Sequence, residues 1–364
     1  VLASAGLWQG VFLVNIPVAL LVWWALSRSA VAADAQRRPW GDRSGTMLLA
    51  CWTIAVTIAL VQGPSWGWTS PATVGAMGVG VITFVGFVVV ELRSTDPLLD
   101  LRLFRSRGLS GSVVLNFSNN AVFVAFTFLM SLYLQVALGY SAMEAGSFFV
   151  AASGAALVTG PFTDRLVSRV GLSFVAIGGA LVSATGLLVV TRLSPGSSAM
   201  VGVLAFVLIG CGVATIANSS AIGMSVSVGE SEEGAASGVF NTGGMLASSL
   251  GVVAGSLVFG AIAMRRFTDA IAETGAQVGG ASSTEIEYLV TGEATEPIRD
   301  SLVAPEVAEL AVDSFAGGIA WTMAILALAL VVSSAVSALM LRGQSGRSQP
   351  RVTVLDESLT QRPD

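Results

Sequence analysis

The chain has 364 residues, of which 54% are hydrophobic and only 11% are charged, and its mean hydropathy is +0.78. Soluble globular proteins carry about a quarter of charged residues, so this composition excludes an ordinary water-soluble domain. The net charge of −5 gives no basic footprint for nucleic acid. Histidine is absent, which excludes imidazole metal sites and histidine acid–base catalysis.

Nine apolar runs without a charged residue follow one another along the chain, each close to the roughly 20 residues that a helix needs to cross a bilayer. They cover residues 8–27, 45–62, 72–90, 109–134, 145–162, 172–191, 193–218, 235–264 and 314–341. Cys51 and Cys211 fall within these runs, which indicates small core side chains and no disulfide framework. We therefore predict an all-α integral membrane protein with about nine transmembrane helices.

Arginine, the only basic residue type present, predicts which connections lie in the cytoplasm, because short cytoplasmic loops are enriched in basic residues. The connections 28–44 and 92–108 and the tail after residue 341 carry four arginines each, and 163–171 carries Arg165 and Arg169. The alternate connections 63–71 and 134–144 carry none. We expect the arginine-rich set and the C-terminus to be cytoplasmic in a multi-pass protein of the plasma membrane.

Two polar segments lie outside the runs. The connection 265–313 is predicted to be external and holds 10 of the 23 acidic residues. We interpret it as a solvated cap, with a substrate-binding role as the alternative, and predict a helix over 301–316 that leads into the last run. The tail 342–364 is polar and predicted to be disordered.

Because the chain starts with Val1 and no signal peptide precedes the first run, we expect it to begin inside a longer protein.

Five local patterns carry a family resemblance. Residues 8–17, WQGVFLVNIP, resemble a W-R-x-x-F-x-x-N-x-P segment, with Gln9 in place of the arginine. Residues 97–105, PLLDLRLFR, resemble a cytoplasmic lead-in to a span, and 133–141, YLQVALGYS, followed by EAG at 144–146, resemble a short external turn. Residues 160–171, GPFTDRLVSRVG, are similar to a cytoplasmic gating motif, and 234–241, GAASGVFN, run toward Gly251 and Gly255.

In this order and spacing, the five patterns resemble the fourteen-span drug:proton antiporter (EmrB/QacA-type) branch of the major facilitator superfamily. The resemblance implies a major facilitator fold, in which residues 1–27 are the last span of the N-terminal half. Residues 28–107 would hold two linker spans with cytoplasmic flanks. Residues 108–341 would form the complete six-span C-terminal half with its external loop 265–313, and 342–364 the cytoplasmic tail. The first five spans of the family would be missing, as in an N-terminally truncated fragment.

The resemblance also implies a function: secondary active export of small amphipathic molecules or drugs, by proton antiport and alternating access. The proton gradient would supply the energy, with no cofactor and no metal. The partners would be a small-molecule substrate, the lipid bilayer and the missing N-terminal spans. Proton coupling needs a titratable group in the path. Because the nine runs contain none, we expect the proton site to lie in the missing spans.

The segment around 160–171 supplies the gating candidates, which are Gly160, Asp164, Arg165 and Arg169. A carboxylate and a guanidinium at the membrane edge can form a bidentate pair. Such a pair, made in one state and broken in the other, would bias inward-open against outward-open forms. Plain anchoring of the helix end by arginine is the alternative.

One face of the run 109–134 supplies the substrate-cavity candidates. Asn116, Asn120, Phe123 and Thr127 recur at helical spacing, with Asn119 beside them. Amides in hydrocarbon need partners, so this face should point at protein or at a watery cavity. In the family the matching span lines the cavity, whereas hydrogen bonding between helices is the alternative. Asn241 is a weaker candidate of the same kind.

Two pairs of small residues at i and i+4, Gly234 with Gly238 and Gly251 with Gly255, are predicted to let helices approach closely. We expect no enzymatic activity, since neither a nucleotide-binding loop nor a nucleophile–base pair occurs. An uptake transporter, an inactive fragment or passive membrane scaffold, and a channel remain as alternatives.

Overall fold

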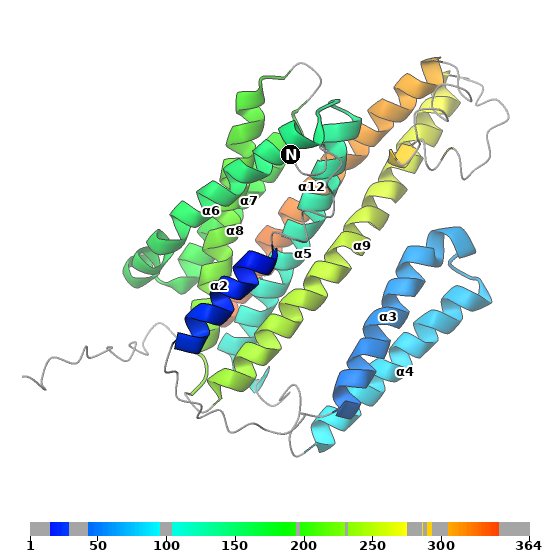
Figure 1. The fold of residues 1–364 in the computed structure, drawn as a ribbon. Helices are drawn as coiled ribbons and strands as arrows, with labels where there is room; N and C mark the ends of the chain where they lie inside the picture. The colour runs from blue at the N-terminus through cyan, green and yellow to red at the C-terminus, as the bar shows by residue number, and fades with distance from the viewer. Residues whose placement is uncertain are drawn as a thin grey trace, which may run out of the picture.

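The computed structural model describes residues 15–28, 43–94, 104–193, 197–229, 232–274, 286, 290–292 and 305–341. The regular structure in these ranges is helical, as predicted for an all-α protein (Figure 1). The helices are α2 Asn15–Arg28, α3 Arg43–Trp66, α4 Pro71–Arg93, α5 Arg107–Val136, α6 Ala142–Val170, α7 Leu172–Val190, α8 Ala199–Ser225, α9 Glu233–Thr274 and α12 Pro305–Leu341.

Eight of these helices, α3 to α9 and α12, are long and apolar enough to cross a membrane, counted over the described residues. They correspond to eight of the nine predicted runs. The remaining run is represented by α2, and residues 8–14 of that run lie outside the described ranges. At about 1.5 Å per residue, α9 and α12 are roughly 63 and 56 Å long, so both extend well beyond a hydrocarbon layer of about 30 Å.

Serine residues set the starts of several helices. Ser70, Ser106, Ser141 and Ser198 precede α4, α5, α6 and α8, and each side chain accepts a hydrogen bond from a backbone N–H of the first turn. Ser141 forms a full capping box with Glu144. These bonds satisfy donors that a helix start leaves open.

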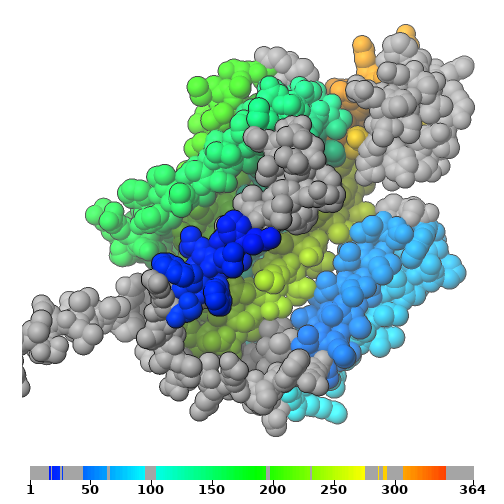
Figure 2. Space-filling view, viewed as in Figure 1, coloured from blue at the N-terminus to red at the C-terminus, as the bar shows by residue number. Residues whose placement is uncertain are grey.

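Helix α5 lies at the centre of the bundle, where it packs against α8, α9 and α12. Helix α7 packs between α8 and α12, and α6 covers α8. Helices α3 and α4 pack mainly on each other and form a hairpin beside α9 (Figure 1). In the space-filling view, α2 is seen in front of the bundle, between α6 and α9 (Figure 2).

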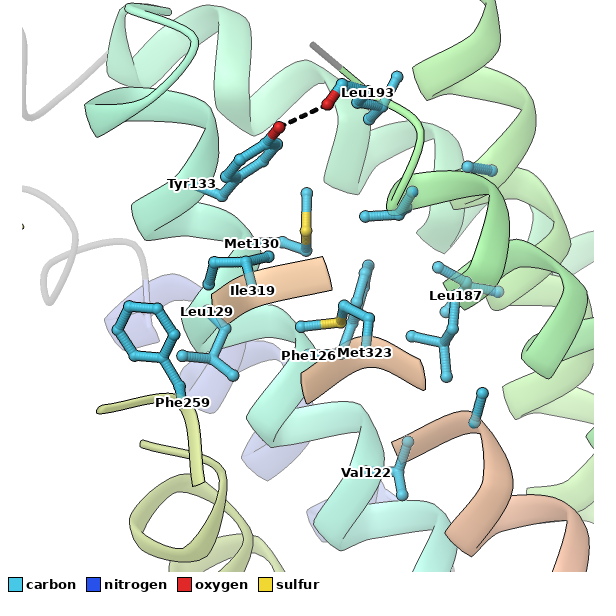
Figure 3. Close-up of a cluster of buried hydrophobic side chains, with 14 of the residues drawn as sticks. Val122, Phe126, Leu129, Met130, Tyr133, Leu187, Leu193, Phe259, Ile319 and Met323 are labelled. Carbon is cyan, nitrogen blue, oxygen red and sulfur yellow. Dashed lines mark hydrogen bonds between the residues drawn. The ribbon is translucent and has the colours of Figure 1, made fainter. Parts of the chain in front are cut away.

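The main core is apolar and joins six helices, α5 to α9 and α12, and Figure 3 shows part of it. Phe126, Leu129 and Met130 of α5 meet Leu187 of α7, and Phe259 of α9 and Ile319 and Met323 of α12 close the cluster. The Tyr133 hydroxyl donates to the carbonyl oxygen of Leu193, which ties the far end of α5 to the connection after α7. A second, separate cluster of Leu109, Met224 and Ala236 holds the opposite end of the bundle.

Several boundaries differ from the predicted runs. Helix α6 continues through the predicted connection 163–171 to Val170, and Gly171, at a φ of 90°, alone separates it from α7. Helix α8 begins at Ala199 and ends at Ser225, later than the run 193–218 at both ends. Helix α9 extends ten residues past the predicted end at 264. Polar residues extend these helices because intrahelical hydrogen bonds remain favourable outside the apolar layer.

Candidate transport site

The amide of Asn116 joins α5 to α9. Its Nδ2 donates to the carbonyl oxygen of Phe240 at 2.9 Å, and its side chain is 7% exposed. The Asn120 Nδ2 in turn donates to both the main-chain and side-chain oxygens of Asn116, at 2.8 and 2.9 Å. A Cβ atom added to Gly244 would lie 2.9 Å from the Asn116 amide nitrogen. In this structure Asn116 therefore forms a hydrogen bond between two helices, which was the alternative to lining a substrate cavity.

Asn119, about 60° around α5 from Asn116, reaches a different neighbouring helix. It is 3% exposed, and its Nδ2 donates to the carbonyl oxygen of Val213 in α8 at 3.4 Å. Residues 116 and 119 are about 60° apart around a helix and about 4.5 Å apart along it, so the two adjacent amides can bond two different neighbouring helices. The sequence grouped them as one candidate set, and the structure separates them between α9 and α8.

Three of the predicted cavity residues remain half-buried on α5. These are Asn120, Phe123 and Thr127, and the Thr127 hydroxyl donates to the carbonyl oxygen of Phe123. Phe123 packs at the margin of the main core. Of the predicted face, these three side chains are the ones that retain surface for a bound molecule.

A neighbouring stripe of α5 is more exposed than the predicted cavity residues. Phe117 and Phe128 are 38% and 45% exposed, and Gln135 is also exposed. Spacings of 7 and 11 residues place the three side chains on one side of the helix. The helical spacing of these three residues is visible in the sequence, but the predicted cavity face was defined by the asparagines next to them.

Asn241 is exposed on α9, and its Nδ2 donates to the carbonyl and hydroxyl oxygens of Ser237. Its side-chain bonds thus stay within its own helix. The structure does not bring Asn241 together with the amides of α5: Phe240, one residue earlier, is the residue that faces Asn116.

The two glycine pairs of α9 differ in how closely another helix approaches them. A Cβ atom added to Gly251 would lie 2.4 Å from the carbonyl oxygen of Ala121, and one added to Gly255 would lie 2.9 Å from the Cβ of Ala125. Here the backbones of α9 and α5 approach closely. Gly234 and Gly238 do not match the predicted packing role, since an added Cβ would meet no described atom within 4 Å.

The gating candidates lie in the last three turns of α6 and not in a loop. Asp164, Arg165 and Arg169 are exposed, and no ion pair joins Asp164 to either arginine in the described structure. Neighbours at i and i+1 on a helix point in different directions, which separates Asp164 from Arg165. The Arg165 guanidinium instead lies 5.9 Å from the centre of the Phe162 ring. The expected pair within this segment is therefore not formed in this structure.

Gly160 faces α8. A Cβ atom added there would lie 3.5 Å from the Asn218 Nδ2, and the hydroxyl of Thr159, the preceding residue, donates to the Cys211 sulfur at 3.2 Å. A small polar seam thus runs between α6 and α8. The gating segment of α6 therefore packs next to the part of α8 that carries Asn218.

One buried acid was missed. Helix α4 continues past the predicted end of its run to Arg93, and Glu91 in its last turn is 4% exposed. It follows Gly80 and Phe87 on the buried face of α4. The expectation that the spans hold no titratable group is corrected by this residue, which the charge-free definition of a run left out.

Within the described ranges, no three acidic or cysteine side chains are grouped as a metal site requires.

Residues 1–252 match the model of the Major Facilitator Superfamily, a stretch of sequence that reaches from before α2 into α9. The chain belongs to this superfamily. The predicted family, the all-helical membrane fold and the absence of an enzymatic role are thereby confirmed, since the members of this family and the relatives below are transporters.

Curated relatives of this chain are export and resistance proteins. It is 33% identical over 210 residues to the tetracenomycin C resistance and export protein of Streptomyces glaucescens, covering 57% of this chain and 39% of that protein. It is 32% identical over 242 residues to the cephamycin export protein CmcT of Amycolatopsis lactamdurans, covering 65% and 49%. It is 31% identical over 272 residues to the methyl viologen resistance protein SmvA of Salmonella typhimurium, covering 72% and 52%. The chain thus spans about half the length of these relatives or less.

Among solved structures, a bacterial homologue of the human lysosomal transporter Spinster aligns with 82% of this chain and 68% of its own. The TM-score is 0.48 and the sequence identity is 14%.

Proposed function

We propose that this protein takes part in secondary active export of small amphipathic molecules across the plasma membrane. The observation that carries the proposal is the superfamily match over residues 1–252 together with relatives that are named as export and resistance proteins. The described helices are consistent with it: α5 presents half-buried Asn120, Phe123 and Thr127 beside exposed Phe117 and Phe128.

The chemistry of this side of α5 suits an apolar molecule with a few polar groups. Aromatic rings bury apolar area, and a small number of amides and hydroxyls fix orientation. Helices α5, α7 and α8 carry no acidic residue. We therefore propose that these helices supply substrate contacts and that the proton gradient acts through an acid elsewhere in the protein.

Alternating access is the mechanism that we propose for the transport cycle, in which two sets of spans rock around a central site. In this proposal the end of α6 that carries Asp164 and Arg165 lies in the cytoplasm, as does the C-terminus. The side chains of Asp164 and Arg165 are exposed, and in another state each could pair with a residue on another span.

A dye-efflux assay tests the proposal. The protein is expressed in bacteria that lack their own drug exporters, and accumulation of several fluorescent cationic and neutral dyes is followed over time. We expect lower accumulation than in cells with an empty vector. A protonophore should restore accumulation, because antiport stops when the proton gradient collapses.

The variants Asn120→Ala and Phe123→Ala should change which dyes are exported while the pH dependence of efflux stays nearly fixed, since neither residue is ionisable. Thr268→Ala, on an exposed part of α9 outside the predicted cavity face, serves as the control. Higher dye accumulation than in control cells would indicate uptake and contradict export. A uniform loss for all dyes with a displaced pH optimum would contradict a role of Asn120 and Phe123 in recognition.

A further inference from the structure

One backbone carbonyl of α9 receives a side-chain hydrogen bond from another helix. The Asn116 Nδ2 of α5 donates to the carbonyl oxygen of Phe240 at 2.9 Å. In an α-helix this carbonyl also accepts from the backbone N–H four residues later, which belongs to Gly244. The carbonyl oxygen of Phe240 can thus accept both the Gly244 N–H and the Asn116 amide, which ties this turn of α9 to α5.

Two consecutive glycines occupy the same turn. Gly243 has open space beside it, with the nearest atom, a Val113 methyl carbon, 3.7 Å from an added Cβ. Gly244 lies against the amide nitrogens of Asn116 and Asn120. Glycine has a low helix propensity because it loses the most backbone entropy, so a glycine pair makes this turn the easiest place to bend.

The packing of α9 changes at this turn. Beyond it, Gly251 and Gly255 lie directly on α5, and Phe259 and Ala263 belong to the main core. Before it, the segment 233–242 contributes Ala236, with Phe240 at the margin, to the small separate cluster.

Two faces of this first segment are loosely held. A Cβ atom added to Gly234 or Gly238 would meet no described atom within 4 Å. Its first residue, Glu233, accepts a hydrogen bond from the Ser225 hydroxyl at the end of α8, where both groups are exposed. The first segment of α9 therefore packs through Ala236 and Val239 on one face, whereas its Gly234 and Gly238 face is exposed.

We propose that α9 bends at Gly243–Gly244 and that Asn116 is the latch that holds the segment 233–242 in the straight form described here. This inference rests on the proposed transport function, because the bend would open and close the end of the pathway next to Glu233. Asn116 acts as a positioning residue: it holds the backbone of α9 and touches no substrate.

The first test compares two glycine substitutions in the same helix. Gly243→Ala and Gly238→Ala raise helix propensity equally, and neither added Cβ clashes with a described neighbour. The hinge predicts that Gly243→Ala raises the ratio of straight to bent forms about fivefold, whereas Gly238→Ala leaves it unchanged. Spin labels on Ala235→Cys and Arg107→Cys, in a Cys51→Ser and Cys211→Ser background in lipid nanodiscs, report the distance between the ends of α9 and α5.

The second test releases the latch. Asn116→Ala should broaden the distance distribution or add a longer component, and Asn119→Ala is its matched control. Both substitutions remove a buried amide from α5, but Asn119 donates to α8 and not to α9. If Asn116→Ala fails to fold, the comparison between Gly243→Ala and Gly238→Ala still decides the question.

The distance measurement and the dye assay separate the two proposals. One narrow distance in every variant, with efflux intact and equal in Gly243→Ala and Gly238→Ala, would overturn the hinge. Two distances that respond to Gly243→Ala, in a protein that exports no dye, would leave the hinge standing and contradict the proposed function.

Discussion

The asparagines of α5 differ in burial: two of them bond neighbouring helices, and one stays partly exposed. Asn116 and Asn119 look alike in the sequence, yet each donates to the backbone of a different helix, and both are buried. Asn120 differs because it is half-buried and donates back to Asn116. An amide in an apolar layer always needs a partner, but the sequence does not say whether the partner is a helix, a water molecule or a substrate.

Gly251 offers a residue-scale prediction. The Cβ of Gly251→Ala would lie 2.4 Å from the carbonyl oxygen of Ala121, and backbone atoms cannot move aside as a flexible side chain can. We expect overpacking that destabilises the protein by about 1–3 kcal/mol. The measurement is the midpoint of thermal unfolding in detergent, which should fall. Gly234→Ala, with open space around it, is the control, and equal midpoints for both variants would refute the close approach of α9 to α5.

At the scale of elements, the hairpin of α3 and α4 is a unit of its own. Gly80 and Gly86 of α4 face Val56 and Leu48 of α3, and the Trp52 and Phe84 rings lie 5.1 Å apart. These contacts pair residues 48–56 of α3 with residues 80–86 of α4, so the two helices form one packed pair. The resemblance to two linker spans fits this arrangement, and we propose that the hairpin moves as one body.

A disulfide tests the register of this hairpin. A Cβ atom on Gly80 would lie 3.9 Å from the Cβ of Ala55, within the separation that a disulfide requires. The variant Ala55→Cys with Gly80→Cys, in a background without Cys51 and Cys211, should cross-link on mild oxidation and lose labelling by a maleimide polymer in denaturant. The control pair Ala55→Cys with Gly86→Cys should stay labelled, because Gly86 lies near Leu48. Cross-linking of the control alone would show that the register is wrong.

At the scale of the whole molecule, the open question is how the bundle sits in the membrane. The arginine distribution predicts that α6 runs inward, from an external start to a cytoplasmic end. Met143 and Ser168 are exposed near its two ends. They allow the orientation of the entire bundle to be measured on a single helix.

We expect an impermeant maleimide to label Met143→Cys in intact cells and Ser168→Cys only after the cells are permeabilised, both in the background without Cys51 and Cys211. The physical reason is that the reagent cannot cross the bilayer, so only externally placed thiols react. The reverse pattern would invert the proposed topology. It would also place the segment 233–242 of α9 outside the cell.

The sequence by itself determined the fold class and the family. Charge-free runs of about 20 residues leave a chain few choices other than spanning helices, because every backbone polar group in hydrocarbon must bond within its own helix. The five local patterns placed the family before any contact was known, and eight of the nine runs are candidate spans in the described structure.

Only the tertiary structure decided which polar residues face a neighbour. The gating carboxylate Asp164 has no arginine partner in its own segment, and Glu91 proved to be buried although its run ended one residue earlier. Among the glycine pairs, the one at 251 and 255 meets α5 while the one at 234 and 238 meets no described neighbour. The periodicity of a single helix fixes the direction of each side chain, but which helix lies in that direction depends on how all the helices pack together.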